Sequence, residues 1–179
     1  MSDKIQQYNA ATKQLIDRAE TLFSGHQLAG SYSIAETVTR FRDAFRNLDL
    51  RGRVITSPLE ELRIANQRYS EGFCIISTYS WGHGLGLFGP GRPWQFHQFR
   101  NLRTYGTHAW MQNRETGEIF DLTFDQFIDQ SGVQMTIPYN CIDATVANPM
   151  MPFEPGYIFS DHIGPDFGAM VRQNSLRRD

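Results

Sequence analysis

Three amphipathic helix patterns follow one another in the first third of the chain. Residues 3–23 place apolar side chains at spacings of three and four, which gives one apolar stripe along a helix. A second pattern begins at Ser33, where Ser33 and Glu36 form a capping box. A third begins at Ser57, and Glu60 completes its box. Because each stripe needs an apolar surface to cover it, we expect a helical layer packed on other elements.

Short strands are predicted only in the second half of the chain. Residues 107–113 and 118–122 have strand patterns on either side of a turn, and a helix is predicted to begin at Thr123. One further strand is predicted at Val133–Ile137. Helices followed by a small antiparallel sheet are typical of the α+β class.

Length and composition favour a single domain over residues 1–179. The chain has 179 residues, of which 40% are hydrophobic and 13% aromatic, enough to bury one sizeable core. It has no long apolar run, and its first residues lack the apolar centre of a secretion signal. We therefore expect a soluble, cytoplasmic protein.

The charged residues exclude some partners. A formal net charge of -2 gives no long-range attraction for nucleic acid or for an anionic membrane, so neither is expected as a partner. Of the 17 basic residues, only Lys4 and Lys13 are lysines. Genomic composition drift is one interpretation of this bias. Delivery into a host cell, where few lysines leave few sites for ubiquitin, is the other.

Cys74 is the first candidate for chemistry. The chain has two cysteines, Cys74 and Cys141, which are too few for a disulfide framework. A glycine-containing turn precedes Cys74, and a helix pattern follows it. A helix N-terminus favours the thiolate, which is the nucleophilic form of cysteine. A buried structural cysteine is the alternative, so Cys74 needs partner residues to support a catalytic role.

The predicted hairpin supplies those partners. Its register pairs Met111 with Phe120. Trp110 then lies opposite Asp121, and His108 shares a face with Asp121 as its diagonal neighbour, roughly 7–8 Å away at the backbone. A carboxylate at that distance can hold one ring nitrogen of the imidazole and leave the other for a thiol. A shift of one residue would separate the two side chains, so the prediction depends on register.

These residues resemble a known superfamily. The segment His108-Ala-Trp, a turn and then Asp121-Leu-Thr is similar to the histidine and aspartate half of papain-like and transglutaminase-like thiol enzymes. In that superfamily a cysteine opens a helix, and the histidine and aspartate follow on adjacent strands, in the order seen here from Cys74. The resemblance covers residues 67–127. It implies a papain-like α+β fold in which the nucleophile helix packs on a small antiparallel sheet.

The resemblance also implies an activity. It suggests acyl transfer at an amide bond, without a cofactor, on a protein or peptide substrate. Gln67 precedes Cys74 much as papain-like enzymes place a glutamine, so it is the candidate for stabilising the oxyanion. The superfamily usually has small residues and often a tryptophan beside the cysteine, whereas this chain has Phe73 and Ile75. Protease, deamidase and transglutaminase therefore all stay open.

Residues 81–94 form a segment rich in glycine, proline and aromatic residues, which predicts a mobile loop. Such a loop could cover the acyl pocket, and the predicted substrate-binding residues are Trp81, His83, Trp94 and Trp110. The same loop supports a different class of function, a non-enzymatic domain that binds a partner through exposed aromatic rings. No pair of histidines has the spacing of a zinc site, so no metal is expected.

Overall fold

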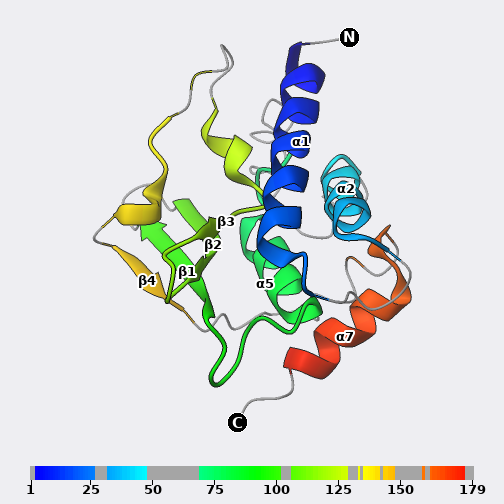
Figure 1. The fold of residues 1–179 in the computed structure, drawn as a ribbon. Helices are drawn as coiled ribbons and strands as arrows, with labels where there is room; N and C mark the ends of the chain where they lie inside the picture. Colours follow the sequence, from blue (N-terminus) through cyan, green and yellow to red (C-terminus); the bar gives the residue numbers. More distant parts are fainter. Residues whose placement is uncertain are drawn as a thin grey trace.

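The computed structural model describes most of the chain. The described residues are 3–26, 32–47, 69–101, 106–128, 133, 135–141, 143–147, 159 and 162–175. Within them the chain forms four α-helices and one sheet of four antiparallel strands (Figure 1). The expected combination of helices with a small antiparallel sheet is therefore confirmed.

The first two helices form where the sequence predicts them. They are α1 (Asp3–Phe23) and α2 (Ile34–Phe45). The Glu36 N–H donates to Ser33 Oγ at 3.1 Å, and the Ser33 N–H donates to Glu36 Oε2 at 2.8 Å, so the capping box is complete. The buried residues of α1 are Tyr8, Ala11, Leu15, Ala19 and Phe23. The helix predicted at Ser57 lies outside the described residues.

The sheet has the strand order β3-β2-β1-β4. Its strands are β1 (Trp94–Asn101), β2 (Gly106–Asn113), β3 (Ile119–Phe120) and β4 (Ala144–Val146). Met111 pairs with Phe120, so the predicted register of the hairpin is confirmed. β3 is shorter than expected, and the helix predicted at Thr123 is a single 3-10 turn, η1 (Phe124–Phe127).

The strand predicted at Val133–Ile137 is wrong. The described residues of that segment belong to no strand, and Val133 and Met135 are exposed. With Val133 and Met135 exposed, the apolar alternation lacks the buried face that stabilises a strand. A second 3-10 turn, η2 (Pro138–Asn140), follows. The sheet instead gains β1 and β4, which the sequence analysis did not predict.

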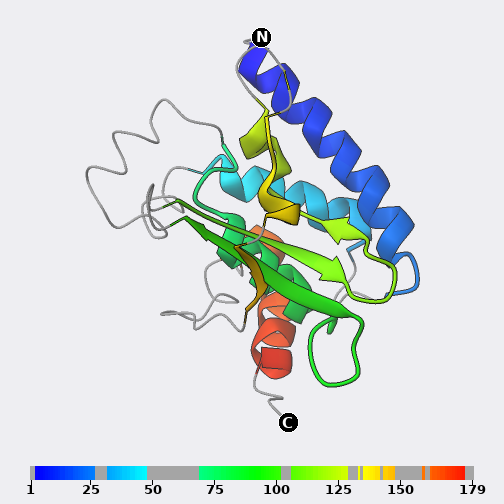
Figure 2. The same cartoon turned by 90° about the vertical axis from the view of Figure 1, so that its left-hand side faces the viewer.

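Helix α5 (Cys74–Gly84) forms the centre of the core. It packs against β1 and β2 and against α7 (Pro165–Ser175), and Figure 2 looks onto the sheet with α5 and α7 behind it. Nearly all of its residues are buried, as expected of a helix that is covered on every side. The Thr78 hydroxyl donates to the Ala109 carbonyl at 3.2 Å and joins the helix to β2.

The expectation of a loop beginning at Trp81 is wrong, because α5 continues through Gly84. The glycines at the C-terminal end of α5 allow aromatic rings to pack closely against the helix backbone. A Cβ at Gly82 would lie 2.0 Å from a ring carbon of Phe88, and one at Gly84 would lie 2.2 Å from a ring carbon of Phe167. Both rings therefore rest on the helix backbone, at positions that only glycine leaves open.

Two of the predicted substrate-binding tryptophans belong to the core. Trp81 is 0% exposed and Trp94 is 6% exposed. The Phe23 ring centroid lies 5.7 Å from that of Trp81 and 5.1 Å from that of Trp94. The prediction that Trp81 contacts substrate is therefore wrong, because no substrate can reach a fully buried ring. None of the described helices is both long enough and apolar enough to cross a membrane.

The glycine contacts predict a stability effect. Gly82→Ala and Gly84→Ala should each lower the free energy of unfolding by about 1–3 kcal/mol, because the added methyl group forces an aromatic ring out of its place. Gly25→Ala is the matched control, since a Cβ there meets nothing within 4 Å. Urea denaturation of the three variants provides the test. Equal midpoints for all three would contradict this account of the packing.

Candidate active site

Cys74 is the first residue of α5 and is 5% exposed. The turn before it closes with the Phe73 N–H donating to the Ser70 carbonyl at 3.2 Å. Phe73 occupies the N-cap position and has no side chain that can cap the helix. No side chain at the N-cap position therefore accepts from the N–H groups of the first turn, and a helix N-terminus of this kind favours a nearby anion. The predicted position of the cysteine is confirmed.

His108 and Asp121 form the predicted hydrogen bond. His108 lies in β2 and Asp121 directly follows β3. The His108 Nε2 atom is 2.7 Å from Asp121 Oδ2, and both side chains are buried. The confirmed pairing of Met111 with Phe120 explains the contact, because it puts the two side chains on the same face of the sheet.

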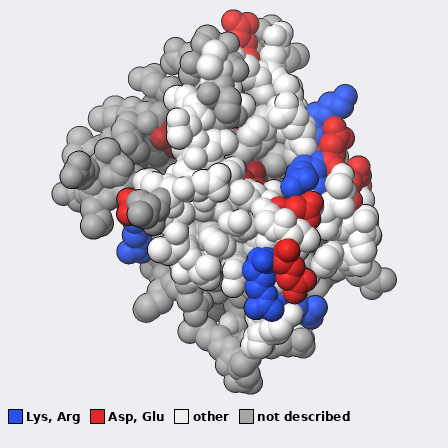
Figure 3. Space-filling model, turned by 60° about the vertical axis from the view of Figure 1, so that its left-hand side comes forward, with Lys and Arg blue, Asp and Glu red and all other residues white. Residues whose placement is uncertain are grey.

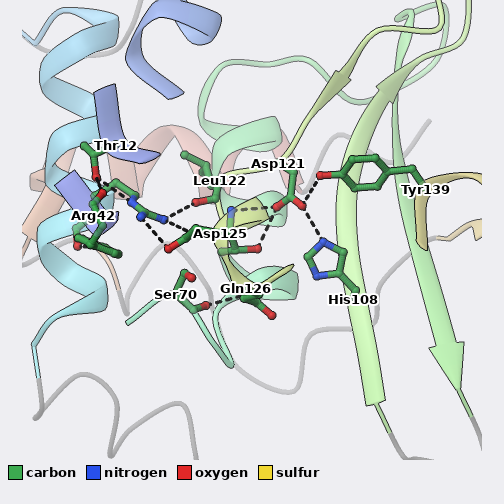
Figure 4. Close-up of polar contacts among 11 residues, drawn as sticks. Thr12, Arg42, Ser70, His108, Asp121, Leu122, Asp125, Gln126 and Tyr139 are labelled. Atoms are coloured by element: carbon green, nitrogen blue, oxygen red, sulfur yellow. Dashed lines mark hydrogen bonds and ion pairs between the residues drawn. The ribbon is translucent and has the colours of Figure 1, made fainter. Parts of the chain in front are cut away.

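The Asp121 carboxylate accepts four hydrogen bonds. Its Oδ1 atom accepts from the Thr123 N–H at 2.8 Å and from the Thr123 hydroxyl at 2.9 Å. Its Oδ2 atom accepts from the Tyr139 hydroxyl at 2.7 Å as well as from His108, and Figure 4 shows Asp121 between these two rings. The sequence analysis missed Tyr139. Its position in η2 depends on the tertiary fold, and no local pattern marks it.

The pKa values show how strongly these groups are coupled. Burial lowers the pKa of His108, but the charge and hydrogen bond of Asp121, with a contribution from Cys74, outweigh it and raise that pKa to about 10. Burial raises the pKa of Asp121, but His108, Tyr139 and Thr123 together hold it below its usual range. Burial and the Asp121 charge raise the pKa of Tyr139 well above its usual value. The imidazolium and the carboxylate are therefore both charged at neutral pH.

The remaining ring nitrogen of His108 is left for the thiol. Nδ1 is buried and makes no hydrogen bond within the described part of the chain. Besides Asp121, Cys74 is the group that raises the pKa of His108, so the sulfur lies within interaction range of the imidazole. The Cys74 Sγ atom is 3.7 Å from the carbonyl oxygen of Thr107, the residue next to His108. Because His108 is protonated at neutral pH, Nδ1 can donate to a thiolate.

Aromatic rings exclude water from the pair. Trp110 stacks on His108 with centroids 5.9 Å apart, and Phe127 meets the imidazole edge to face at 4.7 Å. Trp110 is 0% exposed, so it packs beside the pair as expected, whereas the prediction that it contacts substrate is wrong. A low local dielectric strengthens the attraction between His108 and Asp121.

A second buried ion pair holds the segment that carries Asp121. Arg42 of α2 donates to Asp125 through two nitrogens, at 2.7 and 3.0 Å, and also to the Leu122 carbonyl at 3.0 Å. The same guanidinium donates to Thr12 of α1 at 3.1 Å. The Gln126 amide then donates to the Ser70 carbonyl at 3.1 Å, in the turn before Cys74 (Figure 4). The turns that present the thiol and the carboxylate are thus joined to each other and to both N-terminal helices.

A pocket of about 780 Å³ opens beside His108. Its described lining consists of Glu71, Phe99, Thr107, His108, Gln126, Phe127, Met135, Thr136, Ile137, Pro138, Asn140 and Cys141. Half of these residues are apolar, and apolar atoms form most of the exposed wall. The volume of the pocket is that of a typical ligand site. Figure 3 shows one face of the molecule, on which acidic and basic side chains of the described residues are interspersed around a largely uncharged area.

The other predicted site residues lie elsewhere. His83 and Trp94 line a different pocket, toward the C-terminal end of α5, so the structure does not bring them to His108. Gln67 lies outside the described residues. Within the described ranges, no group of three or more His, Cys, Asp or Glu side chains is placed to hold a metal ion.

Comparison with known proteins gives no match. The chain matches no family model, no curated protein and no solved structure. The functional argument therefore rests on the residues of this chain and on their geometry.

The buried pair of Arg42 and Asp125 predicts a large loss of stability. Arg42→Ala should lower the free energy of unfolding by about 3–5 kcal/mol, because it leaves the Asp125 charge buried and unpaired. The double variant Arg42→Met with Asp125→Leu should recover much of that loss. Arg18→Ala is the control, since its pair with Glu118 is exposed and contributes about 1 kcal/mol or less. Equal effects of Arg42→Ala and Arg18→Ala in urea denaturation would contradict the assignment.

The pair of His108 and Asp121 predicts a pH dependence of stability. The folded pKa of His108 is raised from 6.5 to about 10, so its contribution is fully present below pH 6.5 and is lost as the pH rises toward about 10. The folded pKa of Asp121 is lowered from 3.8, so its contribution is lost only in acid. The stability difference between the parent and Asp121→Asn should therefore shrink from pH 6.5 upward. A difference independent of pH across that window would contradict the coupling.

Proposed function

We propose that this chain is a thiol-dependent acyl-transfer enzyme that acts on amide bonds, with Cys74 as nucleophile, His108 as acid and base, and Asp121 as the residue that orients His108. One observation carries the proposal. Asp121 holds Nε2 of His108, so Nδ1 is left on the side of a cysteine that opens a buried helix. A nucleophile, a base and a third group that orients the base are the parts that covalent catalysis needs.

The proposed reaction has two halves. In the first, the Cys74 thiolate attacks the amide carbonyl, and His108 donates its Nδ1 proton to the leaving amine, so that a thioester forms as the C–N bond breaks. In the second, His108 takes a proton from water or from a second amine, which attacks the thioester and releases the thiolate. The Cys74 N–H, in the uncapped first turn of α5, is suited to stabilise the oxyanion of each intermediate, and Gln67 stays the predicted second donor.

The lining of the pocket beside His108 supports a proposal about the acyl part of the substrate. Thr107 and His108, which both interact with Cys74, line this pocket, although Cys74 itself is not among its described lining residues. Phe99, Phe127 and Ile137 are among its apolar lining. We therefore expect the acyl part of the substrate to present an apolar group, as the side chains of a protein or peptide can. The protease, deamidase and transglutaminase reactions share the steps above and differ in the acceptor that resolves the thioester.

The papain-like and transglutaminase-like arrangement belongs to the same proposal. The cysteine opens a helix, the histidine follows on β2, and the aspartate comes directly after the neighbouring strand β3. These features support the arrangement. The alternative is a partner-binding domain that uses residues 81–94. Trp81 of that segment is fully buried and presents no surface to a partner.

Alkylation of the two cysteines tests the proposal within one protein. We expect iodoacetamide to modify Cys74 faster than Cys141 at pH values below the ~8.5 of an ordinary thiol, although Cys141 is the more exposed of the two. His108→Ala should slow the reaction of Cys74 by about ten-fold or more and leave that of Cys141 unchanged. Peptide mass spectrometry reads both rates at once. Faster labelling of Cys141, or no effect of His108→Ala, would overturn the proposal.

Activity variants give a second test. Cys74→Ser, His108→Ala and Asp121→Ala should each remove most turnover without unfolding the chain, and combining them should add little, because the three residues act as one unit. The acyl donor can be identified by trapping the thioester after incubation with cell extract and measuring the mass added to the Cys74 peptide. Turnover by Cys74→Ala equal to that of the parent would contradict the choice of nucleophile.

A further inference from the structure

A second pocket lies at the opposite end of α5 from the thiol. Its volume is about 460 Å³, and among the described residues it shares no lining with the pocket beside His108. His83, which lines it, is nine residues after Cys74 in the same helix, a separation of about 14 Å along the axis. The proposed acyl transfer therefore leaves this pocket without a role.

Three basic side chains line this pocket and come from different segments. His83 comes from α5, Arg92 from the loop before β1, and Arg114 from the turn after β2. The loop that carries Arg92 and the turn that carries Arg114 are joined, because the Arg114 N–H donates to the Pro93 carbonyl at 2.9 Å. No acidic side chain is among the described residues that line the pocket. Because the whole chain has a net charge of -2, this local excess of cations is not a general property of its surface.

Aromatic rings form much of the remaining wall. Tyr79, Phe88, Trp94 and Phe96 line the pocket with the three basic side chains. The Phe88 ring is fixed against the backbone of Gly82, and the His83 ring packs against it edge to face with centroids 5.3 Å apart. These contacts hold flat surfaces in place, and such surfaces favour a planar ligand. The volume lies in the range of sites for small organic molecules and exceeds what an inorganic anion alone would fill.

We propose that this pocket, the Arg92–Arg114 pocket, binds a small organic anion that carries a planar ring. The two guanidinium groups match the geometry of a phosphate or carboxylate, with which arginine forms paired, charge-assisted hydrogen bonds. The ring of the ligand packs against the aromatic wall formed by Phe88 and its neighbours. The segment of glycine, proline and aromatic residues before β1 thus forms one side of an anion site, where the sequence analysis expected a lid over the thiol.

Four probes separate the two parts of the ligand. Calorimetric titration of the full chain would use 1-naphthyl phosphate, 1-naphthoate, 1-naphthol and inorganic phosphate. We expect at least one ring-bearing anion to bind about ten-fold or more tightly than both naphthol and inorganic phosphate, which each lack one part. The comparison of naphthyl phosphate with naphthoate identifies the preferred anionic group. Naphthol binding as tightly as both anions, or no binding by any probe at millimolar concentration, would overturn the proposal.

Arginine substitutions and the NMR resonances of tryptophan test where the ligand binds. Arg92→Ala and Arg114→Ala should each weaken binding of the preferred anion by about ten-fold, whereas Arg18→Ala, a surface variant outside the pocket, should not change it. The ligand should shift the indole N–H resonance of Trp94 and leave that of Trp110 unchanged. Unchanged affinity in both pocket variants would overturn the proposal. Because Cys74→Ser should bind as the parent does, the outcome is independent of the proposed acyl transfer.

Discussion

The bidentate pair of Arg42 and Asp125 is the contact on which the arrangement of the site depends. It joins α1, α2 and the segment after β3 at one guanidinium group, and Gln126 extends the connection to the turn before Cys74. Buried ion pairs contribute little net stability when compared with apolar residues of equal volume. Their geometry is nonetheless demanding, because each charge must meet its partner. This pair therefore fixes the position of a turn more than it adds to the free energy of folding.

The segment between β3 and the end of η1 contains two buried carboxylates that face different partners. Asp121 meets the His108 imidazolium, and Asp125 meets the Arg42 guanidinium. Each negative charge is thus matched by a buried positive charge, and neither pair relies on solvent. Because Asp121 also accepts from Thr123 and Tyr139, its carboxylate has little freedom to rotate. A fixed carboxylate leaves His108 with one orientation, which is the preorganisation that acid and base catalysis requires.

Local patterns in the sequence predicted part of this structure. The stripe of α1, the capping box of α2 and the register of the hairpin each depend on residues close together in the chain, and all three are confirmed. The contact of His108 with Asp121 followed from that register. Long-range features were missed, including Tyr139 and the pairing of β1 with β4. The glycines of α5 were misread because the rings that rest on them come from elsewhere in the chain.

Some of the missed features left a signal in the sequence. Trp94 and Phe96 alternate with the polar residues Gln95 and His97, and an alternation of period two is typical of a strand with one buried face. Arg42 interrupts the apolar face of α2 next to Phe41, and a lone cation in such a stripe points to a buried acidic partner. No signal of this kind identifies the partner, because Asp125 lies more than eighty residues away.

The distribution of these contacts along the chain has a consequence for biosynthesis. The groups that orient His108 and hold its neighbours come from positions between Thr12 and Tyr139. A ribosome adds residues from the N-terminus, so Cys74 and His108 leave it before Asp121, and Tyr139 follows later. Until then the carboxylate lacks one of its four donors. The network that fixes the orientation of Asp121, and through it that of His108, is therefore completed only after the segment that carries Tyr139 has packed against the sheet.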